Sequence, residues 1–156
     1  TDIGPLVNQA AVAELSAQVD NALSQGAIRV TGAEAIEKDG SWFQPGIIEG
    51  VTQEMDAYHQ EMFGPVAMLF KVDNFAAAIT LANDSPFGLG SAIFTQDETE
   101  MERAFNEIEA GGTFVNAMTA SDPRLPFGGI KMSGYGRELA REGLLTFCNV
   151  KTCVVA

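Results

Sequence analysis

The chain has 156 residues, of which 46% are hydrophobic and 19% are charged, and this composition is typical of one packed globular domain. The net charge of −12 argues against nucleic acids and acidic membranes as partners, but it says little about small ligands. The longest apolar runs, such as Val66–Phe70, are too short to span a membrane.

The first half of the chain predicts a helix followed by two strands. Asn8 is a favourable N-cap and Gly26 a favourable stop for this helix. Its apolar residues recur at helical spacing and are Val12, Leu15, Val19 and Leu23. Ala27–Thr31 is expected to form a short strand. Trp42–Ile48 is expected to form an edge strand, because Pro45 has no N–H to donate to a neighbour.

The second half alternates strands with helices. The expected strands are Val66–Val72, Ser91–Phe94, Thr113–Asn116 and Phe147–Val155. The expected helices run from Asp73 or Asn74 to Ala82, from Thr95–Glu98 to the pair Gly111-Gly112, and over Arg137–Leu145. This alternation predicts an α/β fold with a layered, largely parallel sheet and flanking helices.

Two cysteines, Cys148 and Cys153, lie five residues apart in the last expected strand. An odd offset places them on opposite faces of a strand, so we expect free thiols rather than a disulfide. No Cys-x-x-Cys or histidine cluster indicates a metal site. Free thiols, together with polar first residues that lack a signal peptide pattern, predict a cytoplasmic protein.

A long irregular segment, Ala117–Gly136, interrupts the alternation of strands and helices. Such loops in small domains are usually functional, so we expect a site there. Arg124 can bind a carboxylate through two hydrogen bonds, and Ser121 can add a neutral donor. The alternative is that Arg124 pairs with Asp122 or with another surface carboxylate. The glycines of Phe127–Gly136 match no phosphate-binding pattern and are expected to permit tight turns.

Glu61 and Phe63 lie just before a forced turn, Gly64-Pro65, that leads into a strand. A carboxylate at the mouth of an α/β sheet can accept hydrogen bonds from the two vicinal hydroxyls of a ribose. An aromatic ring two residues later can lie against a flat ring. From the residues alone, a solvated Glu61 and a core Phe63 are the simpler alternative. The single histidine, His59, is expected to be an exposed turn residue.

Several segments resemble, in order and spacing, the aldehyde dehydrogenase family. They are Ile3-Gly4-Pro5-Leu6, Phe43-Gln44-Pro45, Glu61-Met62-Phe63-Gly64-Pro65-Val66, Leu81-Ala82-Asn83-Asp84, Phe87-Gly88-Leu89, Phe114-Val115-Asn116, Pro126-Phe127-Gly128-Gly129 and Gly136-Arg137-Glu138. The resemblance covers nearly the whole chain and places it in the C-terminal part of the catalytic domain. Ala120-Ser121-Asp122 and the closing Phe147-Cys148-Asn149-Val150 are most similar to the succinate-semialdehyde dehydrogenase branch.

This resemblance implies binding roles for four residues. Glu61 would hold the nicotinamide ribose of NAD or NADP, and Phe63 would pack beside the nicotinamide. Phe127 would border the aldehyde tunnel. Ser121 would contact the carboxylate of an aldehyde such as succinate semialdehyde. The expectation that Arg124 binds the same carboxylate comes from its side-chain chemistry and not from the resemblance, since the arginines that share this carboxylate in the family would lie upstream of this chain.

The resemblance also implies a division of the chain. Residues 1–146 would form part of the catalytic domain, and residues 147–156 would form a terminal strand that contacts another subunit in a homo-oligomer. The cysteine nucleophile of the family lies upstream, so no residue of this chain is expected to be catalytic and the isolated chain is expected to be inactive. The complete enzyme would oxidise an aldehyde to a carboxylic acid. Two alternatives remain open: a non-catalytic interaction or oligomerisation module with this fold, or a superfamily member that acts on other aldehydes or reduces acyl phosphates.

Overall fold

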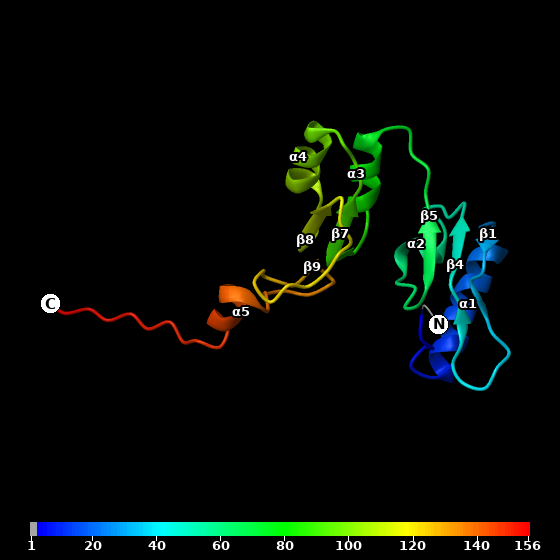
Figure 1. The fold of residues 1–156 in the computed structure, drawn as a ribbon, viewed down its shortest axis with the longest axis horizontal. Coiled ribbons are helices and arrows are strands. Elements are labelled where there is room, and N and C mark those ends of the chain that lie inside the picture. Colours follow the sequence, from blue (N-terminus) through cyan, green and yellow to red (C-terminus); the bar gives the residue numbers. More distant parts are fainter. Residues whose placement is uncertain (1–2) are drawn as a thin grey trace. The chain divides into compact units, whose positions relative to one another are not determined.

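A computed structural model describes residues 3–156, and its contacts divide the chain into two compact units. The first unit ends at Lys71, and the second is Val72–Ala156. Figure 1 shows the helices and strands of both units coloured along the sequence. Both units contain helices and strands, which confirms the predicted α/β class. Within the described residues, no helix is long and apolar enough to cross a membrane.

The first unit contains a three-stranded sheet with one helix packed on it. Strand β4 (Gly46–Glu49) lies in the centre, antiparallel to β1 (Ile28–Thr31) and parallel to β5 (Val66–Leu69). Helix α1 (Gln9–Ser24) packs against this sheet, because its buried side chains share one hydrophobic cluster with Ile48 of β4. The largest fully buried side chains of this core are Leu15, Val19 and Ile48.

Local signals at both ends of α1 have the predicted geometry. The Asn8 side chain accepts a hydrogen bond from the backbone N–H of Ala11 at 2.8 Å, so the predicted N-cap is confirmed. Gly26 has a φ of 113°, a left-handed conformation that glycine adopts without the penalty of a Cβ atom, which confirms the predicted stop.

The prediction of one edge strand over Trp42–Ile48 is wrong, because this segment forms two strands and one of them is central in its sheet. Pro45 separates two strands, β3 (Phe43–Gln44) and β4, and β4 is the central strand of its sheet. The proline stands at the break, so its missing N–H costs no ladder hydrogen bond, and the N–H of Gly46 donates to the Pro65 carbonyl at 2.9 Å. Strand β3 pairs with β2 (Glu34–Ala35), and a short helix, α2 (Asp56–His59), precedes β5.

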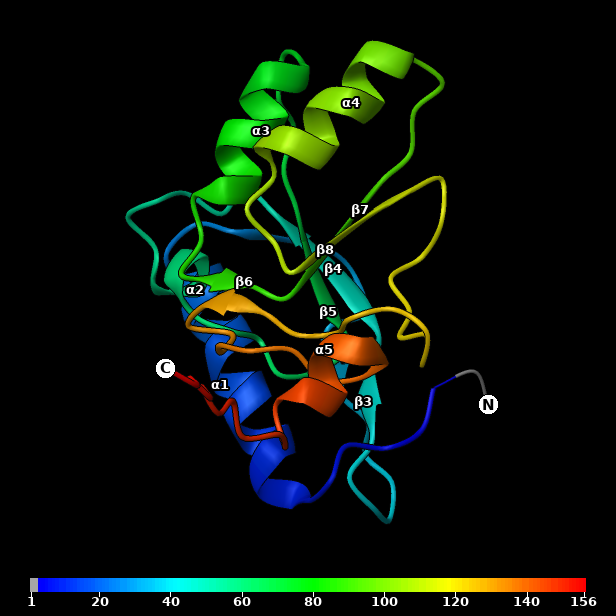
Figure 2. The ribbon, with the colours of Figure 1, turned by 90° about the vertical axis from the view of Figure 1, so that its left-hand side faces the viewer.

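The second unit is built around two parallel strands joined by a helix. Strands β7 (Gly90–Ile93) and β8 (Gly112–Val115) pair in register, and α4 (Glu98–Glu107) connects them. Helix α3 (Phe75–Asn83) lies beside α4 (Figures 1 and 2). The side chains of Asn74 and Asp97 accept backbone hydrogen bonds at the starts of α3 and α4. Asn74 is one of the two predicted starts of α3, and Asp97 lies within the predicted start of α4.

Three shorter elements complete the second unit. Strand β6 (Phe87–Gly88) pairs antiparallel with β9 (Ile130–Lys131), and α5 (Ala140–Leu145) follows. The sheets are therefore mixed rather than largely parallel. Parallel pairing needs a crossover connection, such as the one through α4, whereas the helix-free segment 32–45 brings the chain back antiparallel.

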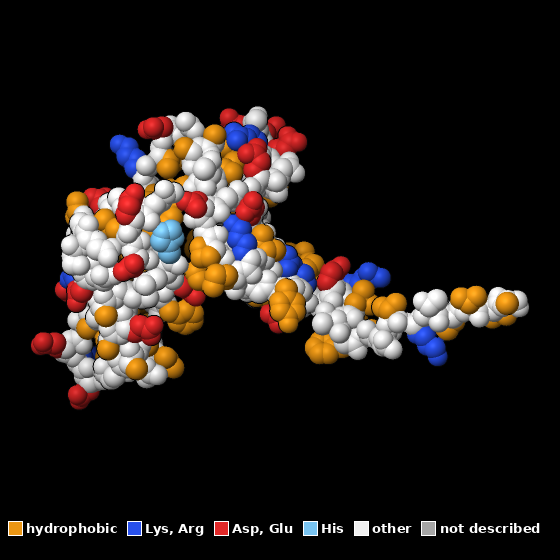
Figure 3. Space-filling view, turned by 180° about the vertical axis from the view of Figure 1, so that it is seen from behind, with side chains coloured by type: hydrophobic (Ala, Val, Ile, Leu, Met, Phe, Trp, Pro, Cys, Tyr) orange, Lys and Arg blue, Asp and Glu red, His pale blue; other side chains and the backbone are white. Residues whose placement is uncertain are grey.

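The predicted terminal strand Phe147–Val155 is absent from this chain, in which residues 149–156 have no secondary structure. A strand needs a neighbouring backbone for its N–H and C=O groups, and the described part of the chain supplies none to this segment. Its apolar side chains are almost fully exposed and are visible along the extended segment in Figure 3. They are Phe147, Val150, Val154 and Val155.

Candidate functional site

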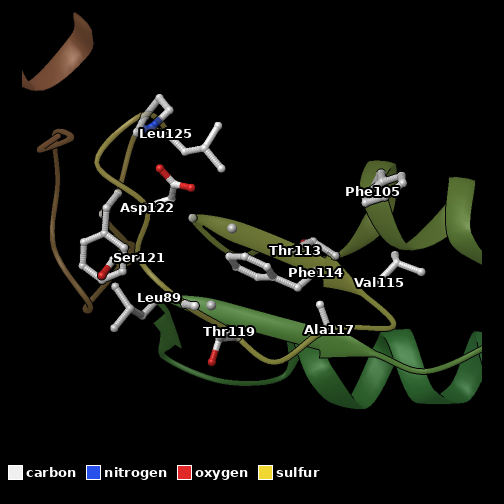
Figure 4. A pocket seen from close by; sticks show the side chains of 17 residues that line it. Leu89, Phe105, Thr113, Phe114, Val115, Ala117, Thr119, Ser121, Asp122 and Leu125 are labelled. Carbon is white, nitrogen blue, oxygen red and sulfur yellow. The ribbon is translucent and has the colours of Figure 1, made fainter. Parts of the chain in front are cut away.

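A cavity of about 680 Å³ lies in the second unit, beside the parallel strands. Strand β8 contributes Phe114, α4 contributes Phe105, and the long loop after β8 contributes Thr119, Ser121 and Asp122 (Figure 4). The remaining lining residues are Leu89, Gly90, Gly111, Gly112, Thr113, Val115, Ala117, Ala120, Leu125, Pro126, Phe127 and Gly128. The lining is mainly apolar with a few polar groups, which is the usual composition of a site for a small organic ligand.

The predicted substrate residues Ser121 and Phe127 line this same cavity. Phe127 is half-buried and is held by two backbone hydrogen bonds with Glu138, of 2.8 and 2.7 Å. Ser121 is exposed on the loop, opposite the Phe114 ring in Figure 4. The structure thus brings a hydroxyl and an aromatic wall to one hollow.

Arg124 is held in an ion pair with Asp122 rather than among the residues that line the cavity. Its Nε and Nη2 atoms donate to the two carboxylate oxygens of Asp122 at 2.9 and 2.6 Å, and its backbone N–H donates to Oδ1 at 2.9 Å. The alternative pairing predicted for Arg124 is therefore the one observed. The hydrogen bonds from the Arg124 side chain and backbone hold the pKa of Asp122 below its usual range, and those to Asp122 raise the pKa of Arg124.

The glycine-rich segment that follows is bound to the rest of the unit through side chains. Ser133 Oγ accepts a hydrogen bond from the Gly88 N–H at 3.0 Å, and Arg137 Nη1 donates to the Gly129 carbonyl at 2.9 Å. Gly111 lies so close to Gly128 that a Cβ atom on Gly111 would be 1.7 Å from the Gly128 carbonyl oxygen. These contacts set the wall of the cavity formed by Phe127 and Gly128. Tight backbone approach explains Gly111 and Gly128, whereas Gly134 and Gly136 have open space around them and adopt a positive φ.

Glu61 and Phe63 lie on an ordered turn of the first unit. The Gly64 N–H donates to the Met62 carbonyl at 2.7 Å, and Gln18 of α1 donates to the Glu61 carbonyl at 3.2 Å. The Glu61 side chain is exposed, and Phe63 is 79% exposed beside a shallow hollow on α1. The alternative of a core Phe63 is therefore wrong, and both side chains are presented to solvent by a fixed backbone.

The other candidate residues contribute little chemistry in this structure. His59 is exposed at the end of α2, as predicted, and its Nε2 lies 2.8 Å from the Gln53 carbonyl oxygen. Cys148 and Cys153 are exposed free thiols. Residues 3–156 contain no group of three or more potential metal-binding side chains.

Sequence reasoning missed the apolar walls of the cavity. Leu89, Phe105 and Phe114 come from segments expected to supply core residues, and nothing in their local pattern distinguishes a cavity wall from a core position.

The architecture defines an α/β protein with a mainly apolar cavity beside a parallel strand pair. Residues 1–153 match the aldehyde dehydrogenase family, and the chain belongs to this family. Over its full length, the chain is 47% identical to a probable NADP⁺-dependent succinate-semialdehyde dehydrogenase from Synechocystis sp.. The match covers 34% of that protein. An NADP⁺-dependent succinate-semialdehyde dehydrogenase from Mycobacterium ulcerans is 47% identical over 97% of this chain and 33% of its own length.

A solved structure gives the same picture. Succinic semialdehyde dehydrogenase from Streptococcus pyogenes, crystallised with NADP⁺, is 44% identical and superposes with a TM-score of 0.88. The match covers 93% of this chain and 32% of that one. The chain therefore spans about a third of the length of the relatives that it matches.

Proposed function

We propose that this chain is the C-terminal portion of an NADP⁺- or NAD⁺-dependent aldehyde dehydrogenase that oxidises succinate semialdehyde, or a similar ω-carboxylated aldehyde, to the acid. The observation that carries this proposal is that Ser121 and Phe127 line one mainly apolar cavity. The similarity to enzymes named as succinate-semialdehyde dehydrogenases supports the same substrate class.

The cavity suits a short aldehyde with a charged end. Phe114, Leu89 and Phe127 offer apolar walls for methylene groups, whose burial is favourable. The Ser121 hydroxyl can donate a hydrogen bond to a substrate carboxylate without adding a second charge. The loop and the glycine-rich segment would therefore select the substrate, while the nucleophile would come from the portion of the enzyme upstream of this chain.

Residues of the first unit fit the nicotinamide half of the cofactor. The exposed Glu61 carboxylate can accept hydrogen bonds from both ribose hydroxyls, and the exposed Phe63 ring can pack beside the nicotinamide. The turn that carries them is held by its own backbone hydrogen bonds and by Gln18, so ribose binding would require little rearrangement. When bound, the cofactor supplies the hydride acceptor.

The terminal segment supports a homo-oligomer. Residues 149–156 have unpaired backbone groups and carry exposed apolar side chains, among them Val150 and Val154. Pairing of this segment with a strand of a second subunit would satisfy both. We place the complete protein in the cytoplasm because the two cysteines of this chain, Cys148 and Cys153, are free thiols.

The test compares the complete protein with the isolated chain. We expect the complete protein to reduce NADP⁺ or NAD⁺ with succinate semialdehyde, and the isolated chain to give no reduced cofactor, with or without Cys148→Ser and Cys153→Ser. If the isolated chain is active and the double-serine variant is not, the proposal that the nucleophile lies upstream of this chain is wrong. A complete protein that self-associates but binds no dinucleotide would favour the interaction-module alternative, and one that oxidises only other aldehydes would overturn the substrate assignment.

A further inference from the structure

We propose that Arg124 determines substrate specificity indirectly, by neutralising Asp122 at the cavity so that an anionic aldehyde can enter. This inference rests on the proposed function of the cavity. It assigns Arg124 as a positioning and charge-compensating residue that acts through Asp122, rather than as a direct ligand of the substrate carboxylate.

Asp122, and not Arg124, lies against the cavity. Asp122 is one of the lining residues and lies in Figure 4 on the loop that borders the hollow, next to Ser121. Arg124 does not line the cavity, and its side chain is 86% exposed, compared with 30% for Asp122. Without its partner, Asp122 would present a negative charge to a cavity that is otherwise mainly apolar.

Arg124 and Asp122 form a forked ion pair. The fork formed by Nε and Nη2 of Arg124 meets both carboxylate oxygens, which is the strongest arrangement available to an Arg–carboxylate pair. The backbone N–H of Arg124 adds a third donor, and the Leu125 N–H donates to the Asp122 carbonyl at 2.9 Å. The compact turn therefore keeps the guanidinium on the carboxylate while Ser121 stays beside it.

An uncompensated carboxylate several ångströms from a substrate anion would be repulsive. Such a pair of like charges near a protein surface weakens binding roughly three- to tenfold at low salt. A neutral aldehyde of the same length would not sense this charge. The ion pair therefore discriminates by charge and leaves the fit of the carbon chain unchanged.

The experiment uses the complete protein and compares succinate semialdehyde with butanal, a neutral aldehyde with the same number of carbon atoms. Three variants are needed: Arg124→Gln, Asp122→Asn, and the two combined. We expect Arg124→Gln to raise KM for succinate semialdehyde roughly three- to tenfold while leaving KM for butanal unchanged. Adding Asp122→Asn should restore KM for succinate semialdehyde, because both charges are then removed.

A matched control exists on α4. Arg103 forms the same kind of forked pair with Glu107, at 2.7 and 2.9 Å, and does not line the cavity. Arg103→Gln should leave the ratio of the two KM values unchanged. Higher ionic strength should shrink the effect of Arg124→Gln, because salt screens exposed charges.

The outcomes separate the proposals. If the double variant stays as impaired as Arg124→Gln, Arg124 binds the substrate carboxylate directly and the indirect role is wrong. An equal loss with both aldehydes would indicate a merely structural role for the turn and would also overturn the inference. If the complete protein oxidises neither aldehyde, the proposed function is wrong. If it oxidises both and Arg124→Gln leaves the ratio of the two KM values unchanged, only the role inferred for Arg124 is wrong.

Discussion

The ammonium nitrogen of Lys131 lies 2.8 Å from Oε2 of Glu109, and it also donates to the carbonyl oxygens of Asn83 and Ser85, at 2.8 and 3.1 Å. Lys131 belongs to β9, in the glycine-rich segment, whereas Asn83 is the last residue of α3. One side chain thus ties the segment that walls the cavity to the negative end of a helix and to the connection after α4.

Replacing this lysine should loosen that connection. We expect Lys131→Met to lower the free energy of unfolding by about 1–2 kcal/mol, because two carbonyl acceptors and one carboxylate lose their donor while the apolar stem is kept. Chemical denaturation of the complete protein measures the change. The matched control is Lys71→Met at an exposed position, and equal losses from both substitutions would contradict the assigned role.

The contact between Gly111 and Gly128 predicts that the cavity wall tolerates no side chain at Gly111. A Cβ atom there would lie 1.7 Å from a backbone oxygen, so Gly111→Ala must move the backbone and should destabilise the protein by roughly 3 kcal/mol or more. Thermal unfolding checks this expectation. Gly4→Ala, where the added Cβ meets nothing within 4 Å, should change the melting temperature little. A mild effect at Gly111 would mean that the wall yields easily.

Glu61 is predicted to position the cofactor. In the complete protein, Glu61→Gln should lower kcat about tenfold or more, because an amide accepts hydrogen bonds from the two ribose hydroxyls less strongly than a carboxylate does. Stability should not change, since the side chain is exposed. Steady-state kinetics and direct dinucleotide titration test this role, and it is lost if both turnover and cofactor affinity match the unsubstituted enzyme.

Ser121 is predicted to recognise the carboxylate end of the substrate. Ser121→Ala should raise KM for succinate semialdehyde by roughly tenfold to a hundredfold, the cost of one hydrogen bond to a charged group. Neutral aldehydes should be oxidised as before, because the apolar walls are intact. A uniform rise in KM for all aldehydes would instead show that the substitution deforms the loop.

The terminal segment is predicted to pair with another subunit. Val154→Lys should weaken self-association at least about tenfold, because association would then bury a charged side chain in place of an apolar one. Sedimentation velocity over a range of concentrations gives the dissociation constant. Lys151→Ala is the control in the same exposed segment. Unchanged association of the Val154→Lys protein would remove the segment from the interface.

Two mistaken expectations have related physical causes. The edge position of Trp42–Ile48 was inferred from the missing N–H of Pro45, yet the proline falls between two strands and leaves β4 free to pair on both sides. The composition of Phe147–Val155 predicted a strand, yet residues 149–156 have no neighbouring backbone in the described chain. In both cases the partner, and not the local propensity, decided the structure.

The sequence by itself determined the α/β class, the helices α1, α3 and α4, the irregular segment 117–136 and the family to which the chain belongs. These features depend on residues close together in the chain, such as Asn8 with Ala11 or Asp97 with Thr99, or on motifs read in order. Only the tertiary structure decided that β4 is central, that Phe114 and Leu89 wall a cavity, and that Arg124 is bound to Asp122. Strand order and cavity walls arise from contacts between distant segments, and the choice among several nearby charges depends on geometry that no spacing rule contains.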